Sequence, residues 1–235
     1  MPKRLRLFPL NAVLFPGTPL NLHVFEPRYK QLIGECIDAG EAFGVVLIRD
    51  GQEAGDPSVQ PHDVGSIAEI VEVTRLPFGR FYISTMGRDR FRISEIISRE
   101  PYLTVEVELI GEDRAEDGDV ESLAGDVRAA FLEYLDVVVQ FSGQESALDL
   151  PGDPQRMSYV VGDALQVADS MKQRLLELDS TVQRLTVELS FLRRLLPQLH
   201  KLLERRNAEL EARPLEDDGV RAEHEKFFGK YFSAN

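Results

Sequence analysis

The sequence predicts an α+β protein, in which a β-rich N-terminal part with one early helix is followed by a helical C-terminal part. Residues 1–110 contain short apolar or β-branched runs separated by turn-forming residues, a spacing typical of a small barrel or sandwich. Residues 111–118 are acidic and rich in turn formers. Beyond them, apolar side chains recur every three or four residues, which is the period of an α-helix.

The first apolar runs are expected to form short strands near the edges of a sheet. Prolines interrupt residues 7–33, and proline cannot donate a hydrogen bond to a neighbouring strand. They are Pro9, Pro16, Pro19 and Pro27. Pro27 also stands where a helix can begin, since the first N–H of a helix has no partner within it. Gly40 is placed to end that helix, and Tyr29 and Cys36 fall on its apolar face.

The remaining strands follow from further apolar and β-branched runs. We predict them at residues 43–48, 67–74, 81–85, 91–97 and 102–110. The sequence Leu76-Pro77-Phe78-Gly79 separates the second run from the third, with proline and glycine where a β-turn favours them. These two strands are therefore predicted to form a hairpin.

The C-terminal part is predicted to be a helical bundle. Its first helix covers residues 120–141, and Asp153-Pro154 then provides an N-cap followed by proline at the first helical position. Two later sites match the capping box, in which a serine and a glutamine three residues later cap a helix N-terminus. These pairs are Ser170 with Gln173 and Ser180 with Gln183.

The last predicted helix has the most regular pattern. Apolar residues alternate between three- and four-residue steps, which is a heptad seam. The seam consists of Val182, Leu185, Leu189, Leu192, Leu196, Leu199 and Leu203. Phe191, Leu195 and Leu202 widen the apolar stripe, which favours burial in a bundle over a free two-stranded coil. Pro197 lies inside this helix and is expected to kink it.

Length and charge limit the number of domains and the class of partner. In the 235 residues we place a β-barrel subdomain at 1–112, a helical bundle at 119–212 and a partly flexible tail at 213–235. The formal net charge of −13 disfavours binding to nucleic acid, whose phosphates need a basic surface, and to anionic membranes. The sequence shows no signal peptide and no membrane-length apolar run. Its single cysteine, Cys36, fits the reducing cytoplasm.

We predict no catalytic, cofactor-binding or metal-binding residues. The histidines show no paired spacing of the kind that metal sites use. They are His23, His62, His200 and His224. Cys36 is expected to be buried and inert rather than nucleophilic. The sequence also lacks a phosphate-binding loop and a Gly-x-Ser-x-Gly nucleophile elbow.

Three charged groups each have a structural and a functional interpretation. The acidic residues within 106–121 are interpreted as a solvated strand face and linker, ahead of a cation or partner site. The last helix carries a basic group that consists of Arg193, Arg194, Lys201, Arg205 and Arg206. It is interpreted as a solvated face, ahead of contacts with the acidic run within the molecule or across a dimer. Arg88, Arg90 and Arg92 alternate along a strand and could hold a carboxylate or phosphate.

The order and spacing of several motifs point to a known family. The motifs are residues 7–33, Val64-Gly65-Ser66-Ile67-Ala68-Glu69-Ile70, Gly87-Arg88-Asp89-Arg90-Phe91, Asp153-Pro154, Leu175-Leu176-Glu177 and Arg184-Leu185. Together they resemble the Lon protease substrate-binding (N-terminal) domain family, especially its stand-alone bacterial members. In this resemblance the second motif is the strand that enters the central hairpin. The third is a glycine-x-x-arginine turn before the next strand.

The resemblance implies a PUA-like β pseudobarrel with one early helix, joined to an α-helical bundle that ends in a long kinked helix. It also implies a non-catalytic module that recognises unfolded or partner polypeptides, because the ATPase and Ser-Lys protease domains would lie beyond Asn235. The polypeptide would bind in an apolar groove near the barrel–bundle junction or add a strand to an exposed barrel edge. We predict contacts from Phe25, Arg28, Tyr29, Phe78 and Arg90.

Other interpretations stay open. PUA-like folds often bind RNA, which the net charge of −13 disfavours. A protease-related enzyme or an adaptor of unknown activity is a further alternative. We expect a cytoplasmic protein without membrane contact, and a homodimer through the last helix or the tail is an additional expectation. Tyr82 joins Phe25, Tyr29 and Phe78 as a candidate for an aromatic recognition surface.

Overall fold

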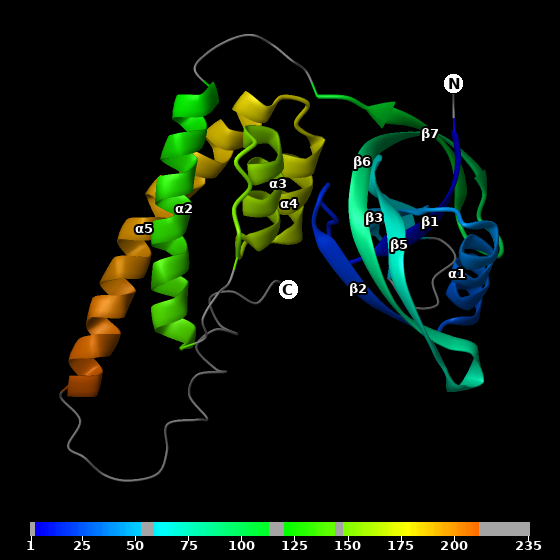
Figure 1. The fold of residues 1–235 in the computed structure, drawn as a ribbon, viewed down its shortest axis with the longest axis horizontal. Helices are drawn as coiled ribbons and strands as arrows, with labels where there is room; N and C mark the ends of the chain where they lie inside the picture. The colour runs from blue at the N-terminus through cyan, green and yellow to red at the C-terminus, as the bar shows by residue number, and fades with distance from the viewer. Residues whose placement is uncertain (1–2, 53–58, 113–119, 144–147, 212–235) are drawn as a thin grey trace.

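The molecule consists of an N-terminal β-barrel and a set of helices beside it (Figure 1). This computed structural model describes residues 3–52, 59–112, 120–143 and 148–211. The strands are β1 (Lys3–Leu10), β2 (Pro19–Val24), β3 (Phe43–Asp50), β4 (Gln60–Pro61), β5 (Val64–Leu76), β6 (Arg80–Ser98) and β7 (Thr104–Ile110). The helices are α1 (Pro27–Ala39), α2 (Val120–Ser142), α3 (Pro154–Ala164), α4 (Asp169–Glu177), α5 (Thr181–Glu211) and the short 3₁₀ helix η1 (Pro77–Gly79). The predicted tail at 213–235 lies outside the described residues.

The barrel is closed by its first strand. The strand order is β1-β7-β6-β5-β3, and a parallel pairing of β1 with β3 completes the circle. β1 pairs with a different strand along each half of its length: residues 3–6 pair with β7, and residues 7–10 pair with β3. β2 adds to β6, and β4 adds to β3. Among the described residues β2 pairs with β6 alone, so it is an edge strand as predicted, with Pro19 at its first position.

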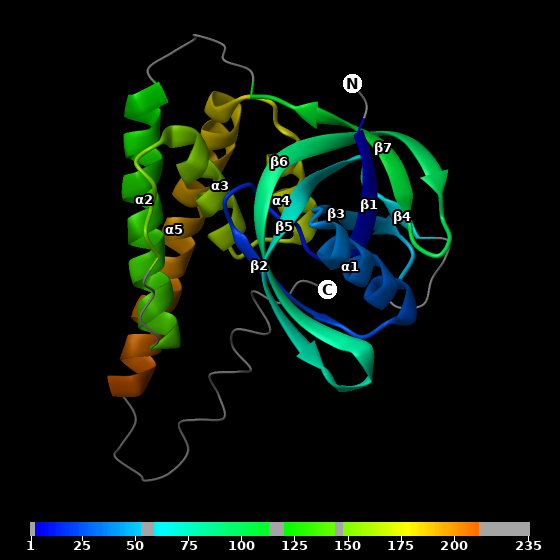
Figure 2. The same ribbon diagram turned by 45° about the vertical axis from the view of Figure 1, so that its right-hand side comes forward.

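β5 and β6 form the predicted hairpin, whose turn end projects away from the barrel (Figures 1 and 2). β6 joins two strands that we predict separately, so the turn predicted at residues 87–91 is wrong. The N–H of Gly87 donates to the Thr18 carbonyl, and the Gly87 carbonyl accepts from the Gly17 N–H, both at 2.9 Å. The glycine therefore marks a close crossing of two backbone segments rather than a turn.

Helix α1 packs on the barrel and completes its core. It begins at Pro27 and ends at Ala39, with Gly40 as its C-cap at a φ of 64°, as predicted. Its buried side chains are Tyr29, Leu32, Ile33 and Cys36. They join an apolar cluster with strand residues such as Phe8, Phe43 and Ile83. A second cluster, around Phe91, fills the rest of the barrel.

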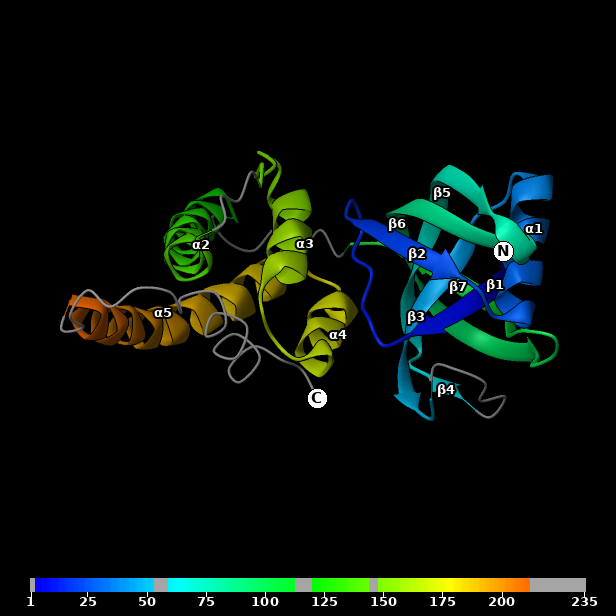
Figure 3. The same cartoon turned by 90° about the horizontal axis from the view of Figure 1, so that it is seen from below.

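The helical part has two layers. α2 and α5 pack along each other, and α3 and α4 lie between them and the barrel (Figures 1 and 3). The seam leucines of α5 from Leu185 to Leu199 are buried in one cluster with Val127 and Phe131 of α2, and Leu203 packs against it partly buried. The seam therefore stabilises the bundle, as the widened stripe predicts. Pro197 lies within α5 and does not end it.

The helix starts follow two of the three predicted caps. The Asp153 carboxylate accepts a hydrogen bond from the Arg156 N–H at 2.8 Å at the start of α3. The Ser180 hydroxyl accepts one from the Gln183 N–H at 3.4 Å at the start of α5. The cap predicted at Ser170 is wrong, because α4 begins earlier, at Asp169 with Ala168 as N-cap.

The length and hydropathy of these helices differ from those of membrane-spanning helices. Within the described part of the chain, none of them combines the length and apolar content that a crossing of the bilayer needs.

Candidate functional site

The predicted contact residues lie in separate places, and two of them belong to the early helix. Tyr29 is 3% exposed, and its ring stacks on Phe8 with the centroids 4.0 Å apart. The Arg28 guanidinium lies 4.5 Å from the centroid of the Tyr29 ring and pairs with Glu26 at 3.2 Å. Tyr29 thus fastens α1 to the barrel and presents no surface to a ligand.

Arg90 lies in the contact between barrel and bundle, within a buried network of charges. It is 2% exposed and donates hydrogen bonds to the carbonyls of Leu176 and Leu178 at 2.7 and 2.6 Å. It also pairs with Glu112 at 3.1 Å. The fully buried Arg184 of α5 donates to the same carboxylate at 2.9 Å. Arg90 does hold a carboxylate, but one from its own chain.

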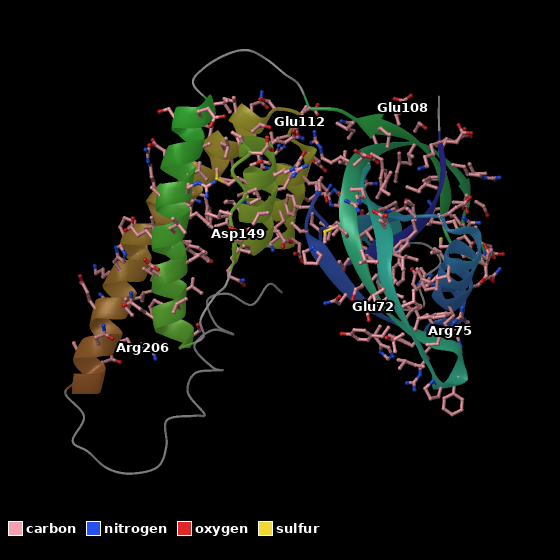
Figure 4. All side chains as sticks on the ribbon, in the orientation of Figure 1. Glu72, Arg75, Glu108, Glu112, Asp149 and Arg206 are labelled. Atoms are coloured by element: carbon pink, nitrogen blue, oxygen red, sulfur yellow. The ribbon has the colours of Figure 1, made fainter. Side chains whose placement is uncertain are left out.

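Glu112 is the centre of this network. Its carboxylate also accepts hydrogen bonds from the hydroxyls of Tyr159 and of Thr181, the latter at 3.0 Å. Burial raises the pKa of Tyr159 to about 12, so its hydroxyl keeps the proton that it donates. Figure 4 shows Glu112 between the barrel and the helices, whereas Glu108 on β7 lies at the outer surface. The solvated interpretation of the acidic run is therefore wrong for Glu112.

A second buried carboxyl group lies one helical turn beyond Arg184. Glu188 is fully buried, and neither of its oxygens has a hydrogen-bond partner among the described residues. A Cβ placed on Gly162 would lie 3.5 Å from its Oε1 atom, so α3 passes close to it. Burial raises the pKa of Glu188 well above its ordinary value, and the Arg184 charge offsets this only in part.

The buried Glu188 leads to a pH-dependent prediction. Above pH 4.5 the unfolded chain loses this proton while the folded protein keeps it, so stability falls as the pH rises towards the folded pKa. Glu188→Met removes both the titration and the unsatisfied oxygens. We expect the variant to gain about 1–3 kcal/mol in the free energy of unfolding at pH 5, and more at pH 8. Urea denaturation at both values measures this, and a gain that shrinks at pH 8 would contradict it. Glu204→Met, at an exposed α5 position, is the control.

Two members of the basic group of α5, Arg193 and Arg206, contact α2. Arg193 pairs with Asp126 at 3.0 Å. Arg206 donates to the Phe141 carbonyl at 2.7 Å and lies over the ring of that residue. Both contacts join α5 to α2.

The outer face of β2 and β6 gathers exposed aromatic rings. Along β2 the side chains alternate, with Leu22 and Val24 buried and His23 exposed. His23 lies directly opposite Tyr82 of β6, with the ring centroids 6.5 Å apart. Phe25 follows at 5.7 Å from His23. Phe25 is 56% and Tyr82 49% exposed, so this aromatic face, made of His23, Phe25 and Tyr82, is open to a ligand.

Phe78 occupies the turn of the hairpin, where neither its exposure nor its backbone conformation favours a phenylalanine. It is 88% exposed, so its ring gains almost nothing from burial. Its φ is 64°, in the left-handed region that costs a residue with a Cβ about 1–2 kcal/mol. Lys30 of α1 donates to the Phe78 carbonyl at 3.1 Å, which ties the turn to the helix. Local stability does not explain a phenylalanine at this position.

A small pocket lies between the end of α1 and β5. Its volume is about 290 Å³, and its lining includes Cys36, Ile37, Ile70 and Val73. Cys36 is buried, as predicted, and burial raises the pKa of its thiol to about 11, so the thiol stays protonated at neutral pH. No group of three or more metal-ligating side chains occurs in the described ranges.

Comparison with known proteins identifies the fold and its family. The ATP-dependent protease La (LON) substrate-binding domain matches residues 4–194 of this chain. The chain belongs to this family. The Lon N-terminal domain protein from Xanthomonas campestris has a similar structure, with a TM-score of 0.58 and 26% identity over 80% of this chain and 98% of that one. The N-terminal domain of the Mycobacterium avium complex Lon protease has a TM-score of 0.60 over 81% of this chain and 98% of that one, and at 18% identity it supports the fold alone.

The curated Lon relatives are much longer than the matched region. The Lon protease of Flavobacterium johnsoniae is 33% identical over 126 residues, which are 53% of this chain and 15% of that protein. Lon protease 2 of Syntrophobacter fumaroxidans is 27% identical over 183 residues, which are 77% of this chain and 23% of that protein. The chain thus corresponds to the substrate-binding domain and to less than a quarter of either protease. The resemblance inferred from the motifs is confirmed.

Proposed function

We propose that this protein is a non-catalytic polypeptide-recognition module that binds unfolded or partner protein segments. The family's description as a substrate-binding domain of a protease supports this role. Of the predicted contact residues, Phe25 and Phe78 are exposed and stay in the proposal. Arg28, Tyr29 and Arg90 leave it, because their side chains contact other residues of the fold.

The aromatic face of His23, Phe25 and Tyr82 beside the edge strand β2 is the observation that carries this proposal. An extended polypeptide can add to a sheet edge through main-chain hydrogen bonds, and side-chain contacts then give specificity. β2 pairs with β6 along one edge only among the described residues. A segment added to its other edge would lie next to the exposed rings. The barrel–bundle junction is less suitable, because buried side chains such as Phe15, Tyr159 and Leu175 fill it.

Binding to an unfolded polypeptide tests the proposal. The ligand is a fluorescently labelled, reduced and carboxymethylated protein, and fluorescence anisotropy measures its affinity for the full chain. We expect the Phe25→Ala/Tyr82→Ala double variant to bind roughly 30-fold more weakly, which corresponds to about 2 kcal/mol for the loss of aromatic contacts at an interface. Both residues are exposed, so the variant is expected to keep the native circular dichroism spectrum.

A control variant separates a specific face from general hydrophobicity. Leu132 on α2 is 47% exposed, and Leu132→Ala removes a similarly exposed apolar side chain far from β2. We expect its affinity to equal that of the unchanged protein. Equal weakening by both variants, or no effect of the double variant, would refute the aromatic face as the binding site.

Self-association and location are separate proposals. We infer that a homodimer uses the exposed face of α5 or the tail at residues 213–235, since the seam leucines from Leu185 to Leu199 are buried in the bundle. A cytoplasmic location remains our proposal from the single cysteine.

A further inference from the structure

The turn of the β5–β6 hairpin combines an exposed aromatic ring with positive charge, in a protein whose net charge is −13. Two cationic side chains, those of Lys30 and Arg80, contact this turn, and a third, that of Arg75, lies on the adjoining part of β5. Lys30 and Arg80 donate to the carbonyls of Phe78 and Pro77, both at 3.1 Å. Arg75 lies over the Phe81 ring, 5.6 Å from its centroid. We call Lys30, Arg75, Arg80 and Phe78 the hairpin tip, and Figure 4 shows Arg75 near this end of the molecule.

The cations of the hairpin tip differ in their partners from several other arginines of the described chain. Arg6, Arg88, Arg90 and Arg184 each pair with a carboxylate. In the part of the chain that the structure describes, no ion pair involves Lys30, Arg75 or Arg80. Their contacts are with carbonyl oxygens and with the rings of Phe81 and Phe78, none of which carries a negative charge. An acidic protein thus keeps a local positive field around an exposed ring.

We propose that the hairpin tip selects acidic polypeptide segments that carry an aromatic or aliphatic side chain. This inference rests on the proposed polypeptide-binding function and assigns its substrate class. The ligand's apolar side chain would pack on the Phe78 ring, and its carboxylates would pair with Arg75, Arg80 and Lys30. The left-handed φ of Phe78 supports this proposal, because backbone strain is common at residues that bind a ligand.

The small number of cations in the hairpin tip favours an acidic polypeptide over nucleic acid or an anionic membrane as the partner. Three cations match a few carboxylates in one segment. Binding to nucleic acid through phosphates commonly uses more contacts and meets repulsion from the rest of an acidic protein. Anionic membranes meet the same repulsion. Both remain measurable alternatives, and the test includes them.

The test compares peptides that differ only in charge. Three labelled 14-residue peptides share one Leu-Phe-Leu centre and have aspartate, serine or lysine flanks, and fluorescence anisotropy measures binding to the full chain. We expect the aspartate peptide to bind about tenfold more tightly than the serine peptide, as several exposed ion pairs allow. The preference should shrink between 50 and 300 mM NaCl, because salt screens exposed charges.

Two variants assign the preference to the hairpin tip. Arg75→Glu/Arg80→Glu is expected to abolish it, whereas Lys201→Glu/Arg205→Glu, which makes the same charge change at exposed positions of α5, is expected to preserve it. Phe78→Gly removes the ring and relieves the left-handed strain. It is expected to be at least as stable as the unchanged protein and to bind all the peptides more weakly, so unfolding cannot explain the loss.

The outcomes separate this inference from the proposed function. Equal affinity for all three peptides would overturn the acidic preference and leave polypeptide recognition standing. If no peptide binds and the unfolded protein ligand also fails to bind, both proposals are wrong. Tighter binding to a labelled single-stranded oligonucleotide, or Phe78-dependent sedimentation with vesicles containing phosphatidylserine, would overturn the inference in favour of that partner.

Discussion

Glu112→Gln is expected to lower the free energy of unfolding by about 3–5 kcal/mol, which is typical when one partner of a buried ion pair is removed. The carboxylate receives Arg90 at 3.1 Å and Arg184 at 2.9 Å, and both guanidinium groups are almost wholly buried. Glutamine keeps the size of the side chain but removes the charge. Two buried cations would then share only carbonyl and hydroxyl oxygens and the more distant Asp179, 3.9 Å from Arg90.

The Glu112→Gln substitution is also expected to weaken the contact between the barrel and the helical bundle. Glu112 follows β7, Arg90 is on β6 and Arg184 is on α5, so this network joins barrel and bundle. Guanidinium denaturation followed by far-ultraviolet circular dichroism measures the loss. Glu108→Gln is the matched control, because Glu108 is exposed on β7, and its effect is expected within about 0.5 kcal/mol. Equal stability of the two variants would show that the buried network contributes nothing.

Local signals in the sequence account for most of the fold. The heptad seam predicts the burial of α5, and Pro27 and Gly40 predict both ends of α1. The Leu76-Pro77-Phe78-Gly79 motif predicts the hairpin turn. Each of these features depends on residues close together in the chain, which is why a periodicity or a turn motif is sufficient.

The candidate site and the buried network were harder to predict because they depend on contacts distant in sequence. Glu112 lies in a run of acidic residues that looks like a linker, and contacts distant in sequence bury it, such as the one with Arg184, 72 positions later. Tyr29 and Phe78 are both aromatic residues beside a proline-containing turn or helix start, yet one is buried and the other exposed. Glu188 offered one signal, since it is a charged residue next to the seam position Leu189.

Gly87 lies inside strand β6, where the sequence predicts a turn, and its substitution is expected to have a large effect on stability. Gly87→Ala is expected to lower the free energy of unfolding by about 3 kcal/mol, the combined cost of overpacking and of strained hydrogen bonds. A Cβ at this position would overlap the Phe15 carbonyl oxygen and lie 2.9 Å from its carbon. These are backbone atoms, so no side-chain rotation can relieve the overlap. The segment must move, and its hydrogen bonds with Gly87 stretch.

A glycine-to-alanine substitution in α2 is expected to change the free energy of unfolding in the opposite direction. Gly125 lies in the exposed face of α2, and a Cβ there would meet nothing within 4 Å. Gly125→Ala is therefore expected to raise the free energy of unfolding by about 1 kcal/mol, since alanine favours the helix over glycine. Denaturation curves for the two variants, measured side by side, distinguish a glycine required by a backbone crossing from one that the helix merely tolerates. If Gly87→Ala is as stable as Gly125→Ala, the close crossing of Gly87 with the Phe15 carbonyl is wrong.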